Sequence, residues 1–460
     1  MFLNHKILII SLLNPNKFLG AILLVSLFAT RVSAQQELML HALPDVWHST
    51  STNPAFFPEN KKLVVGLPGI GLDAAHSGDI SYKDVFTKDG DRTILNFSNA
   101  LAKLDPSNTV DIEQRIETVS LGLRLPGNFW LQAGHANRLS GSVVYPYTLP
   151  SLIWNGNAQY IGQTVDIGMQ ANISDWNEWS LGLAKSFGKL QLGARAKYLT
   201  GVTSLHTDPD HNKAAITTSD DIYQITIDAD YGFHASSFIS AIDTSGLGFD
   251  LKLGELNGKA FSKNTGFAID LGAQFKVNEK ITLDLALLDL GGKIKWTQNP
   301  NYFLSQGEYQ YDGVTIPGID LINGADSIDF ETKLDTLNDI FNFKKTAQEF
   351  ETKLPLRGYL GARYELTQRL SFGVNAYFQK REEEKATVAV GANARFKPFS
   401  WMSLGAMYSI NERSAANLGF HLVFKPGPVQ IYFATDNLLN AFSVKSSPAV
   451  SLRTGLSLIF

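Results

Sequence analysis

Histidine and carboxylate residues, which most often carry acid–base or metal chemistry, gather in one short segment of this chain. The segment contains two histidines and four aspartates, namely His206, Asp208, Asp210, His211, Asp220 and Asp221. Divalent cations such as Ca²⁺ bind to the carboxylate oxygens of aspartate. The spacing matches no metal-binding loop motif, and Asp, Asn and Pro are typical of solvated turns. We therefore interpret the segment as a turn and predict no metal site.

The remaining candidates for chemistry do not form a catalytic set. The nine histidines are scattered, and His135 and His421 fall within strand-like segments, where a polar interior would accommodate them. The absence of cysteine excludes thiol catalysis, iron–sulfur clusters and cysteine-ligated zinc. Charges balance within Lys380–Lys385, which indicates a solvated outer loop, and Gly66–Gly71 lacks the order of a dinucleotide fingerprint. We predict a protein that is not an enzyme, with no catalytic residue and no cofactor.

Composition and the N-terminal segment indicate an exported β-protein. Only 18% of the 460 residues are charged, against roughly 25% in soluble domains. The net charge of −4 excludes a nucleic-acid binder that relies on a basic surface. Residues 1–34 resemble a secretory signal, with lysines, an apolar stretch at 18–30 and small residues before a cleavage site at Ala34. After Gln35 no apolar run approaches the roughly 18 residues of a spanning helix.

Alternation of apolar and polar residues dominates residues 118–460. Val119 and Leu121, for example, alternate with Ser120 and Gly122, and many later segments are close to the 9–11 residues of a tilted spanning strand. The polar face carries Gly, Ser, Asn, Gln and Thr rather than many Lys and Glu, which favours a hydrated lumen over a soluble surface. We predict an all-β fold, a transmembrane antiparallel β-barrel of about 14–16 strands in the outer membrane.

The final strand carries the sharpest single signal. Counting back from Phe460, residues Leu458, Leu456 and Leu452 share one face, although Ile459 interrupts the alternation. An amphipathic strand that ends in Phe resembles the signal read by the outer-membrane barrel-assembly machinery. We predict that these four residues form an assembly signal, with that machinery and outer-membrane lipid as partners.

Connection lengths predict the topology, because such barrels have short periplasmic turns and longer outer loops. Residues 397–400 form a short connection and residues 380–386 a longer one. The alternation holds along the chain if residues 223–231 cross the membrane and a further strand lies at 247–253.

The longest connection, residues 291–353, is predicted to be a helical outer-loop insertion. Its apolar residues recur at helical spacing after a capping Asp329, at Phe330, Leu334, Leu337 and Phe341.

Residues 35–117 differ from the rest of the mature chain. They contain one strand near Lys62–Gly66, a helical pattern at 91–104 and the string Asn53-Pro54-Ala55. A barrel wall cannot accommodate about eighty such residues. We therefore predict that this segment supplies the first strand and a partial plug of the lumen, with Asn53, Pro54 and Ala55 in the plug.

Several short strings together carry a family resemblance. They are Asn53-Pro54-Ala55 with Leu67-Pro68-Gly69, Trp154–Asn157, Ala196–Leu199, Asp289-Leu290-Gly291 with Trp296, Asp436–Leu439, and Leu452–Phe460. The chain is similar to a family of uncharacterised outer-membrane barrels, which resembles the PorP/SprF-type proteins of type IX secretion and gliding motility and, remotely, the FadL-like transporters. The resemblance implies about fourteen strands with an N-terminal segment in or under the lumen, and no catalytic residues.

Two functions therefore remain open. One is the passage or binding of hydrophobic small molecules, which FadL-like proteins achieve with a plugged lumen and a lateral opening. The other is a structural or assembly role in a type IX secretion or gliding-motility system, with an exported surface protein as partner.

Overall fold

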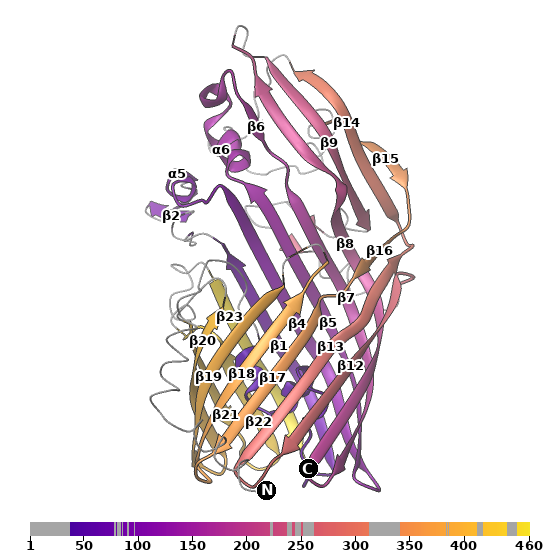
Figure 1. Cartoon of the computed structure of the whole chain (residues 1–460), viewed down its shortest axis with the longest axis vertical. Helices are drawn as coiled ribbons and strands as arrows, with labels where there is room; N and C mark the ends of the chain where they lie inside the picture. The colour runs from indigo at the N-terminus through magenta and orange to yellow at the C-terminus, as the bar shows by residue number, and fades with distance from the viewer. Residues whose placement is uncertain are drawn as a thin grey trace, which may run out of the picture.

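Fourteen strands of the described chain close into an antiparallel β-barrel (Figure 1). The computed structural model describes residues 37–460 except 78–79, 81–83, 85, 90–91, 96, 221–223, 237–241, 244–249, 252–261, 312–340, 383, 385, 412–416 and 439–448. In order around the barrel the strands are β1 (Leu63–His76), β4 (Ser107–Leu125), β5 (Phe129–Pro146), β7 (Gln170–Phe187), β8 (Leu190–Thr218), β12 (Thr265–Lys276), β13 (Ile281–Trp296), β17 (Leu356–Glu365), β18 (Leu370–Lys380), β19 (Thr387–Phe399), β20 (Met402–Asn411), β21 (Asn417–Phe424), β22 (Val429–Thr435) and β23 (Ala449–Ile459). Strand β1 closes the circle, because Val64 lies opposite Gly122 of β4 and Ile459 of β23. The predicted all-β barrel is confirmed.

The alternation of the sequence separates an apolar outer surface from a polar lumen. On β12, Phe267 and Ile269 point outward and are 67% and 51% exposed. The next residue, Asp270, points inward and is fully buried. The same alternation runs along the other barrel strands, whose outward side chains are mainly Leu, Val, Ile, Phe and Tyr. This apolar belt is the surface that a lipid bilayer would cover.

The short connections lie together at one end of the barrel, the end that also holds the C-terminus (Figure 1). There β4 turns into β5 after Leu125, β7 turns into β8 after Phe187, and β19 turns into β20 after Phe399. The longer connections lie at the opposite end. Which end faces the outside of the cell stays a prediction from these lengths.

A smaller sheet extends past the barrel rim at the end with the long connections (Figure 1). It consists of the distal half of β8 with β6 (Thr164–Asp166), β9 (Ile225–Ser236), β14 (Pro300–Tyr311) and β15 (Lys344–Ala347). The expected crossing strand at 223–231 is wrong, because β9 pairs with β8 and β14 in this extension. Alternation marks any half-buried strand, so it did not distinguish a strand in the extension from one in the wall.

The long insertion and the N-terminal segment also differ from expectation. Within 291–353 the structure contains β14, β15 and β16 (Phe350–Lys353), while the predicted helix at 330–341 lies almost entirely outside the described residues. The helical pattern at 91–104 is reduced to α5 (Phe97–Leu101), which follows the short hairpin of β2 (Phe86–Asp89) and β3 (Arg92–Leu95).

Two further elements complete the comparison with the sequence. In place of the added strand at 247–253, β10 (Ile242–Asp243) and β11 (Asp250–Leu251) pair only with each other, and most of that range lies outside the described residues. In the described part of the chain, no helix is long and apolar enough to cross a membrane. The longest helix among those residues, α6 (Thr148–Asn155), packs on the extension near η4 (Ala158–Tyr160).

The lumen contains residues 37–57, which we call the plug. The plug begins with α3 (Leu38–His41) and continues through the 3₁₀ helix η3 (Trp47–Ser51), and almost all of its side chains are buried. It contacts strands on all sides of the barrel, so it lies across the lumen rather than along one wall.

Candidate functional site

Apolar packing holds the first half of the plug in the lumen. Leu38, Met39 and Leu40 are buried against inward side chains of β13 and β17 to β22, a group that consists of Ala286, Leu288, Tyr359, Tyr377, Ala389, Met407, Val423, Tyr432 and Ala434. Each strand contributes one or two of these residues from its otherwise polar inner face. One side of the lumen, formed by β13 and β17 to β22, is therefore apolar where α3 packs against it.

Trp47 anchors the second half of the plug to the wall. Its indole Nε1 donates to Ser120 Oγ at 2.8 Å, and its backbone N donates to Gln430 at 2.9 Å. The ring lies so close to β1 and β4 that a side chain at Gly66 or Gly122 would collide with it. Glycine at these two wall positions thus makes room for the indole.

The string Asn53-Pro54-Ala55 contacts the barrel wall at β5, β12 and β13. Asn53 Nδ2 donates to the backbone carbonyls of Ala273 and Leu285 at 3.3 Å each, and the Asn53 carboxamide oxygen accepts the backbone N–H of Ala55 at 2.9 Å. Gln132 donates to the carbonyl of Pro54 at 3.1 Å. The structure places all three predicted plug residues in the lumen, each buried or nearly so.

Ion pairs add to the attachment of the plug. Glu37 lies 3.6 Å from Arg357 and 3.8 Å from Arg453, both on the barrel wall. Burial alone would raise the pKa of Glu37, but the two guanidinium groups lower it to about 2. Asp45 at the other end of α3 pairs with Arg395 at 2.9 Å and Lys397 at 3.1 Å. The N-terminal half of the plug is therefore fixed at both ends by charge.

Beside the plug, a buried network of charges joins the inner faces of five strands. Lys197 on β8 lies 2.7 Å from Asp289 and 2.8 Å from Asp270, and Asp289 also pairs with Arg357 at 2.7 Å and Arg138 at 3.2 Å. Asp289 occupies a left-handed backbone conformation, φ 62°, at a bulge of β13 that turns its carboxylate into this network. Removing one partner from such a buried network typically costs about 3–5 kcal/mol.

Arg195 connects this network to the plug. Its guanidinium pairs with Asp270 at 2.6 Å and donates to the carbonyl of Thr50 at 3.1 Å and that of Ser51 at 3.4 Å. Arg195 therefore joins the plug to the charged network inside the barrel.

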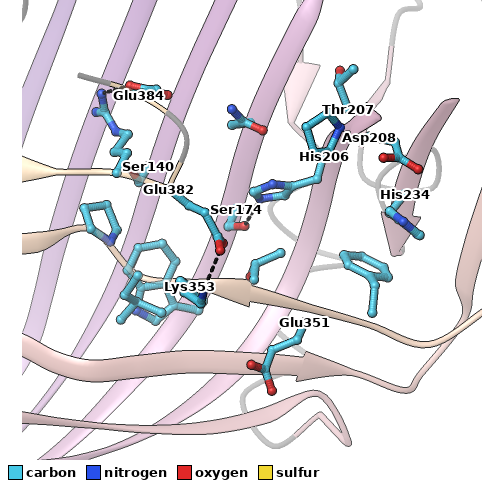
Figure 2. A pocket seen from close by; sticks show the side chains of 18 of the residues that line it. Ser140, Ser174, His206, Thr207, Asp208, His234, Glu351, Lys353, Glu382 and Glu384 are labelled. Carbon is cyan, nitrogen blue, oxygen red and sulfur yellow. Dashed lines mark hydrogen bonds and ion pairs between the residues drawn. The ribbon is translucent and has the colours of Figure 1, made fainter. Parts of the chain in front are cut away.

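Above the plug, toward the long connections, the inner faces of β5, β7 and β8 border a cavity of about 380 Å³ (Figure 2). We call it the upper cavity. Strand β16 and the connection after β18 form its other side, with Phe350, Leu354 and Lys353 among the lining residues. Trp176 lies in its wall, is 1% exposed, and has the Arg138 guanidinium 5.0 Å from the centre of its ring.

Polar side chains line much of the upper cavity. Figure 2 shows Ser174 beside His206, whose Nε2 lies 3.3 Å from the serine hydroxyl. Burial and the neighbouring His234 lower the pKa of His206 to about 4, so its imidazole is neutral. Within the described residues no carboxylate bonds to His206, so this serine–histidine pair lacks the acid that orients a catalytic imidazole.

The connection after β18 reaches across the mouth of the lumen. Arg381 pairs with Asp111 at 3.1 Å and Glu113 at 2.7 Å on β4, which is the opposite wall, and Glu382 pairs with Lys353. The run at 380–385, interpreted from the sequence as a solvated loop, is thus partly turned inward in its described residues.

The outer surface of β4, β5, β7, β8 and β12 contains a second, largely apolar depression of about 550 Å³. We call it the wall depression. Its rim is formed by outward side chains, among them Leu121, Leu181, Tyr198 and Phe267. His135 lies in it and stacks on Trp179 with ring centres 4.2 Å apart.

Small inward residues separate the wall depression from the lumen. Ser120, Gly134 and Ser180 form its floor together with the larger Lys197 of the charged network, and Ser120 is the residue to which Trp47 of the plug donates. The upper cavity begins at Ser140 and Trp176 on the same two strands, β5 and β7, four to six residues farther along. The two hollows therefore lie on opposite faces of one stretch of wall, beside the plug.

The residues of the predicted assembly signal lie on the last strand, β23, and at its end. Leu452, Leu456 and Leu458 lie on the outward face of β23, and Phe460 is 52% exposed at its end. Ile459, which interrupts the alternation, points inward and packs in a cluster with Trp47. His421 is buried on the lumen side.

The described side chains of the His- and Asp-rich segment at 206–221 contact different parts of the chain and do not form one cluster. His211 pairs with Asp230 at 2.7 Å, Asp208 accepts from Tyr302 at 2.8 Å, and His206 points into the upper cavity. Asp221 lies outside the described residues. Among the residues that are described, no three His, Asp or Glu side chains are arranged to hold a metal ion.

Sequence reasoning missed the charged network and both hollows. Isolated charges at inward positions of amphipathic strands, such as Arg138, Glu178 and Lys197, were the available signal, because a charge in a barrel interior must find a partner. Which partners they find depends on strand register, which alternation does not supply.

Comparisons with known proteins identify a family and several similar structures. A family model described as "Family of unknown function (DUF5723)" matches residues 54–436. No curated protein matches the chain. Among solved structures, the chain is similar to the toluene transporter TbuX of Ralstonia pickettii, with 10% identity over 90% of this chain and 93% of that chain, and a TM-score of 0.42. It is also similar to the toluene transporter TodX of Pseudomonas putida (10% identity, 94% and 95% covered, TM-score 0.40) and to a FadL homologue of Pseudomonas aeruginosa (11% identity, 94% and 98% covered, TM-score 0.42).

Proposed function

This chain belongs to the DUF5723 family of unknown function, and we propose that it is a gated, non-enzymatic outer-membrane barrel for hydrophobic small molecules. In this proposal a ligand enters the upper cavity from outside the cell. It then leaves sideways through the wall formed by β4, β5 and β7, while the plug closes the axial path.

The observation that carries the proposal is the position of the two hollows. The upper cavity and the wall depression share β5 and β7, and the inward residues at the floor of the depression are Ser120, Gly134, Ser180 and Lys197. An apolar ligand gains free energy in proportion to the apolar area it buries, about 25 cal/mol per Å². A depression with an apolar rim that faces lipid is therefore a favourable exit for such a ligand. A continuous water-filled pore along the barrel axis would be unfavourable for it.

The plug supports a lateral path over an axial one. It contacts strands all round the barrel, and its charged and apolar contacts would have to break together for an axial pore to open. A lateral exit leaves most of these plug contacts in place and requires the paired strands β4, β5 and β7 to part near Ser120, Gly134 and Ser180, with loss of the hydrogen bond between Trp47 and Ser120.

Transfer of a hydrophobic fluorophore into the bilayer of proteoliposomes tests the proposal. Valine at Gly134 places branched carbon atoms toward Ser120 and Ser180, 3.2 and 3.5 Å from the new Cβ, and should slow transfer at least five-fold. Gly71→Val is the matched control on neighbouring β1, where the nearest atom is 3.6 Å away, and should stay within two-fold of wild type. Circular dichroism verifies that both variants fold.

Equal transfer by the Gly134→Val and Gly71→Val variants would remove the lateral path from the proposal. Transfer that matches protein-free liposomes in the wild type as well would contradict the function itself.

A second candidate function rests on the extension. Phe233 and Phe303 stack with ring centres 4.8 Å apart, and Phe343 packs edge-on against Phe233 at 5.3 Å, outside the barrel. Partly exposed aromatic side chains on a rigid sheet are typical of protein-binding surfaces. This feature favours the assembly role, in which the barrel holds an exported surface protein. Co-purification of one defined exported protein, lost in a Phe233→Ser/Phe303→Ser variant, would support that role.

A further inference from the structure

We propose that the upper cavity selects hydrophobic ligands that carry a positive charge and one hydrogen-bond acceptor, and that it disfavours carboxylates such as fatty acids. This inference rests on the proposed function, because it names the ligand class that the same path accepts. It follows from the charge, the aromatic side chains and one unpartnered donor of the cavity.

The cavity and its ion-pair partners carry an excess of negative charge. Among the described residues, seven carboxylates face four cations, which leaves three negative charges. The carboxylates are Asp111, Glu113, Asp208, Glu349, Glu351, Glu382 and Glu384, and the cations are Lys293, Lys295, Lys353 and Arg381. The excess attracts a cation and repels an anion, and a partly enclosed site strengthens both effects.

Asp208 is the carboxylate best placed to receive an ammonium group. In the described part of the chain no ion pair to Asp208 occurs within 4 Å, unlike the four glutamates of the cavity, each of which has a lysine or arginine partner. Its oxygens accept the Tyr302 hydroxyl at 2.8 Å and the backbone N–H of Asp210 at 3.0 Å. These bonds orient the carboxylate without neutralising it.

Aromatic rings next to Asp208 supply apolar lining for the body of the ligand. His234 and Phe350 line the cavity, and the His234 ring lies between those of Tyr302, 4.5 Å away, and Phe350, 5.0 Å away. These rings pack on one another, and Phe350 also stacks on Trp296 with ring centres 5.9 Å apart, so they contribute apolar area to the body of the ligand rather than free faces for its charge. Burial and the neighbouring Asp208 raise the pKa of Tyr302, so its hydroxyl stays protonated and adds no charge.

Trp176 supplies the independent sign of a polar ligand. Its side chain lines the cavity, is 1% exposed, and its indole Nε1–H has no hydrogen-bond acceptor among the described residues. A buried N–H without an acceptor costs about 1–3 kcal/mol. A carbonyl, ether or hydroxyl oxygen of a ligand that reached this N–H from the cavity would satisfy it, whereas a pure hydrocarbon would not.

The size of the cavity agrees with a small molecule. A volume of about 380 Å³ lies within the usual range of small-molecule sites, roughly 300–1,000 Å³. Phe350, Leu354 and Pro355 provide the apolar part of the lining. A compact aromatic amine with a carbonyl group fits these dimensions and every polar feature described above.

Three probes on one scaffold test the charge preference by titration calorimetry, with the full mature chain in a neutral maltoside detergent. At about pH 5.5, where its ammonium group is fully protonated, phenylalanine methyl ester is a cation, N-acetylphenylalanine methyl ester is neutral, and N-acetylphenylalanine is an anion, and all three carry a carbonyl acceptor. At low salt we expect the cation to bind at least ten-fold more tightly than the anion, with the neutral ester between them. At 0.5 M salt the ratio should shrink several-fold.

Asp208→Asn should lower the ratio of cation to neutral affinity about five-fold, as expected for one charge a few ångströms away. Glu351→Gln, a second change in the lining, should act in the same direction. Asp230→Asn is the matched control, because Asp230 lies in the same extension, is already paired with His211, and does not line the cavity.

An anion that binds as tightly as the cation, or an Asp230→Asn variant that loses the preference as Asp208→Asn does, would overturn the inference. Three probes that bind equally would overturn the charge preference and leave the proposed function intact. No binding of any probe would overturn the inference, and the fluorophore-transfer assay would then decide separately whether the proposed function also fails.

Discussion

Truncation of Trp47 to alanine should loosen the plug without disturbing the barrel wall. The indole is 4% exposed, packs against β1 and β4, and donates to Ser120. Tryptophan-to-alanine changes at buried sites cost about 3–5 kcal/mol. If that cost falls on docking of the plug, the equilibrium between docked and released plug shifts by roughly two to four orders of magnitude, since about 1.4 kcal/mol is a factor of ten.

Planar-bilayer recording measures this shift directly. The wild-type protein should show no large, stable conductance, while the Trp47→Ala variant should show frequent open events. A deletion of residues 35–60 should give the largest conductance. Trp401→Ala is the control, because Trp401 is exposed at the end with the short turns, where its ring stacks on Phe399 and Phe424 of the barrel wall.

Two results would refute this reasoning. Large, non-selective channels from the wild-type protein would mean that residues 37–57 do not close the lumen in a membrane. A Trp47→Ala variant as closed as wild type, together with an open deletion variant, would mean that the anchoring energy lies elsewhere in the plug.

Three further predictions concern charge, topology and assembly. The pKa of Glu37 is lowered from 4.5 to about 2, so its contribution to plug docking is present above pH 4.5 and disappears as the pH falls toward 2. The loss amounts to up to about 3 kcal/mol. Wild-type conductance should therefore rise from about pH 7 to about pH 3, and a Glu37→Gln variant should not show this rise. A Lys344→Cys variant should react with an impermeant maleimide on intact cells and a Ser400→Cys variant should not, and the reverse labelling would invert the topology. Deletion of Phe460 should reduce the amount of heat-modifiable barrel in outer-membrane fractions, and unchanged assembly would contradict its role as a signal.

The period of two in this sequence was sufficient to predict the barrel, because in-and-out alternation is a local property of each strand. β12 and β23 illustrate this, since their outward and inward residues can be assigned from sequence without knowledge of any neighbour. The same local character explains the error at 223–231. A strand in the extension, half-buried against apolar residues, has the alternation of a strand in the wall.

The apparent irregularity at Ile459 has a tertiary cause. An apolar residue at an inward position contradicts a polar lumen, but Ile459 packs against the plug cluster of Trp47, Phe57 and Trp130. Only the presence of a folded segment inside the barrel makes that position apolar, and the sequence of β23 contains no information about it.

The sequence by itself therefore determined the all-β barrel and its polar and apolar faces, since both follow from residues that are neighbours in the chain. The tertiary structure decided the charged network, the upper cavity and the wall depression. Lys197, Asp270 and Asp289 meet because the registers of β8, β12 and β13 align them, and Arg381 reaches Asp111 only across the closed barrel. Contacts between residues that are far apart in the chain depend on register and closure, and neither can be derived from the pattern of a single strand.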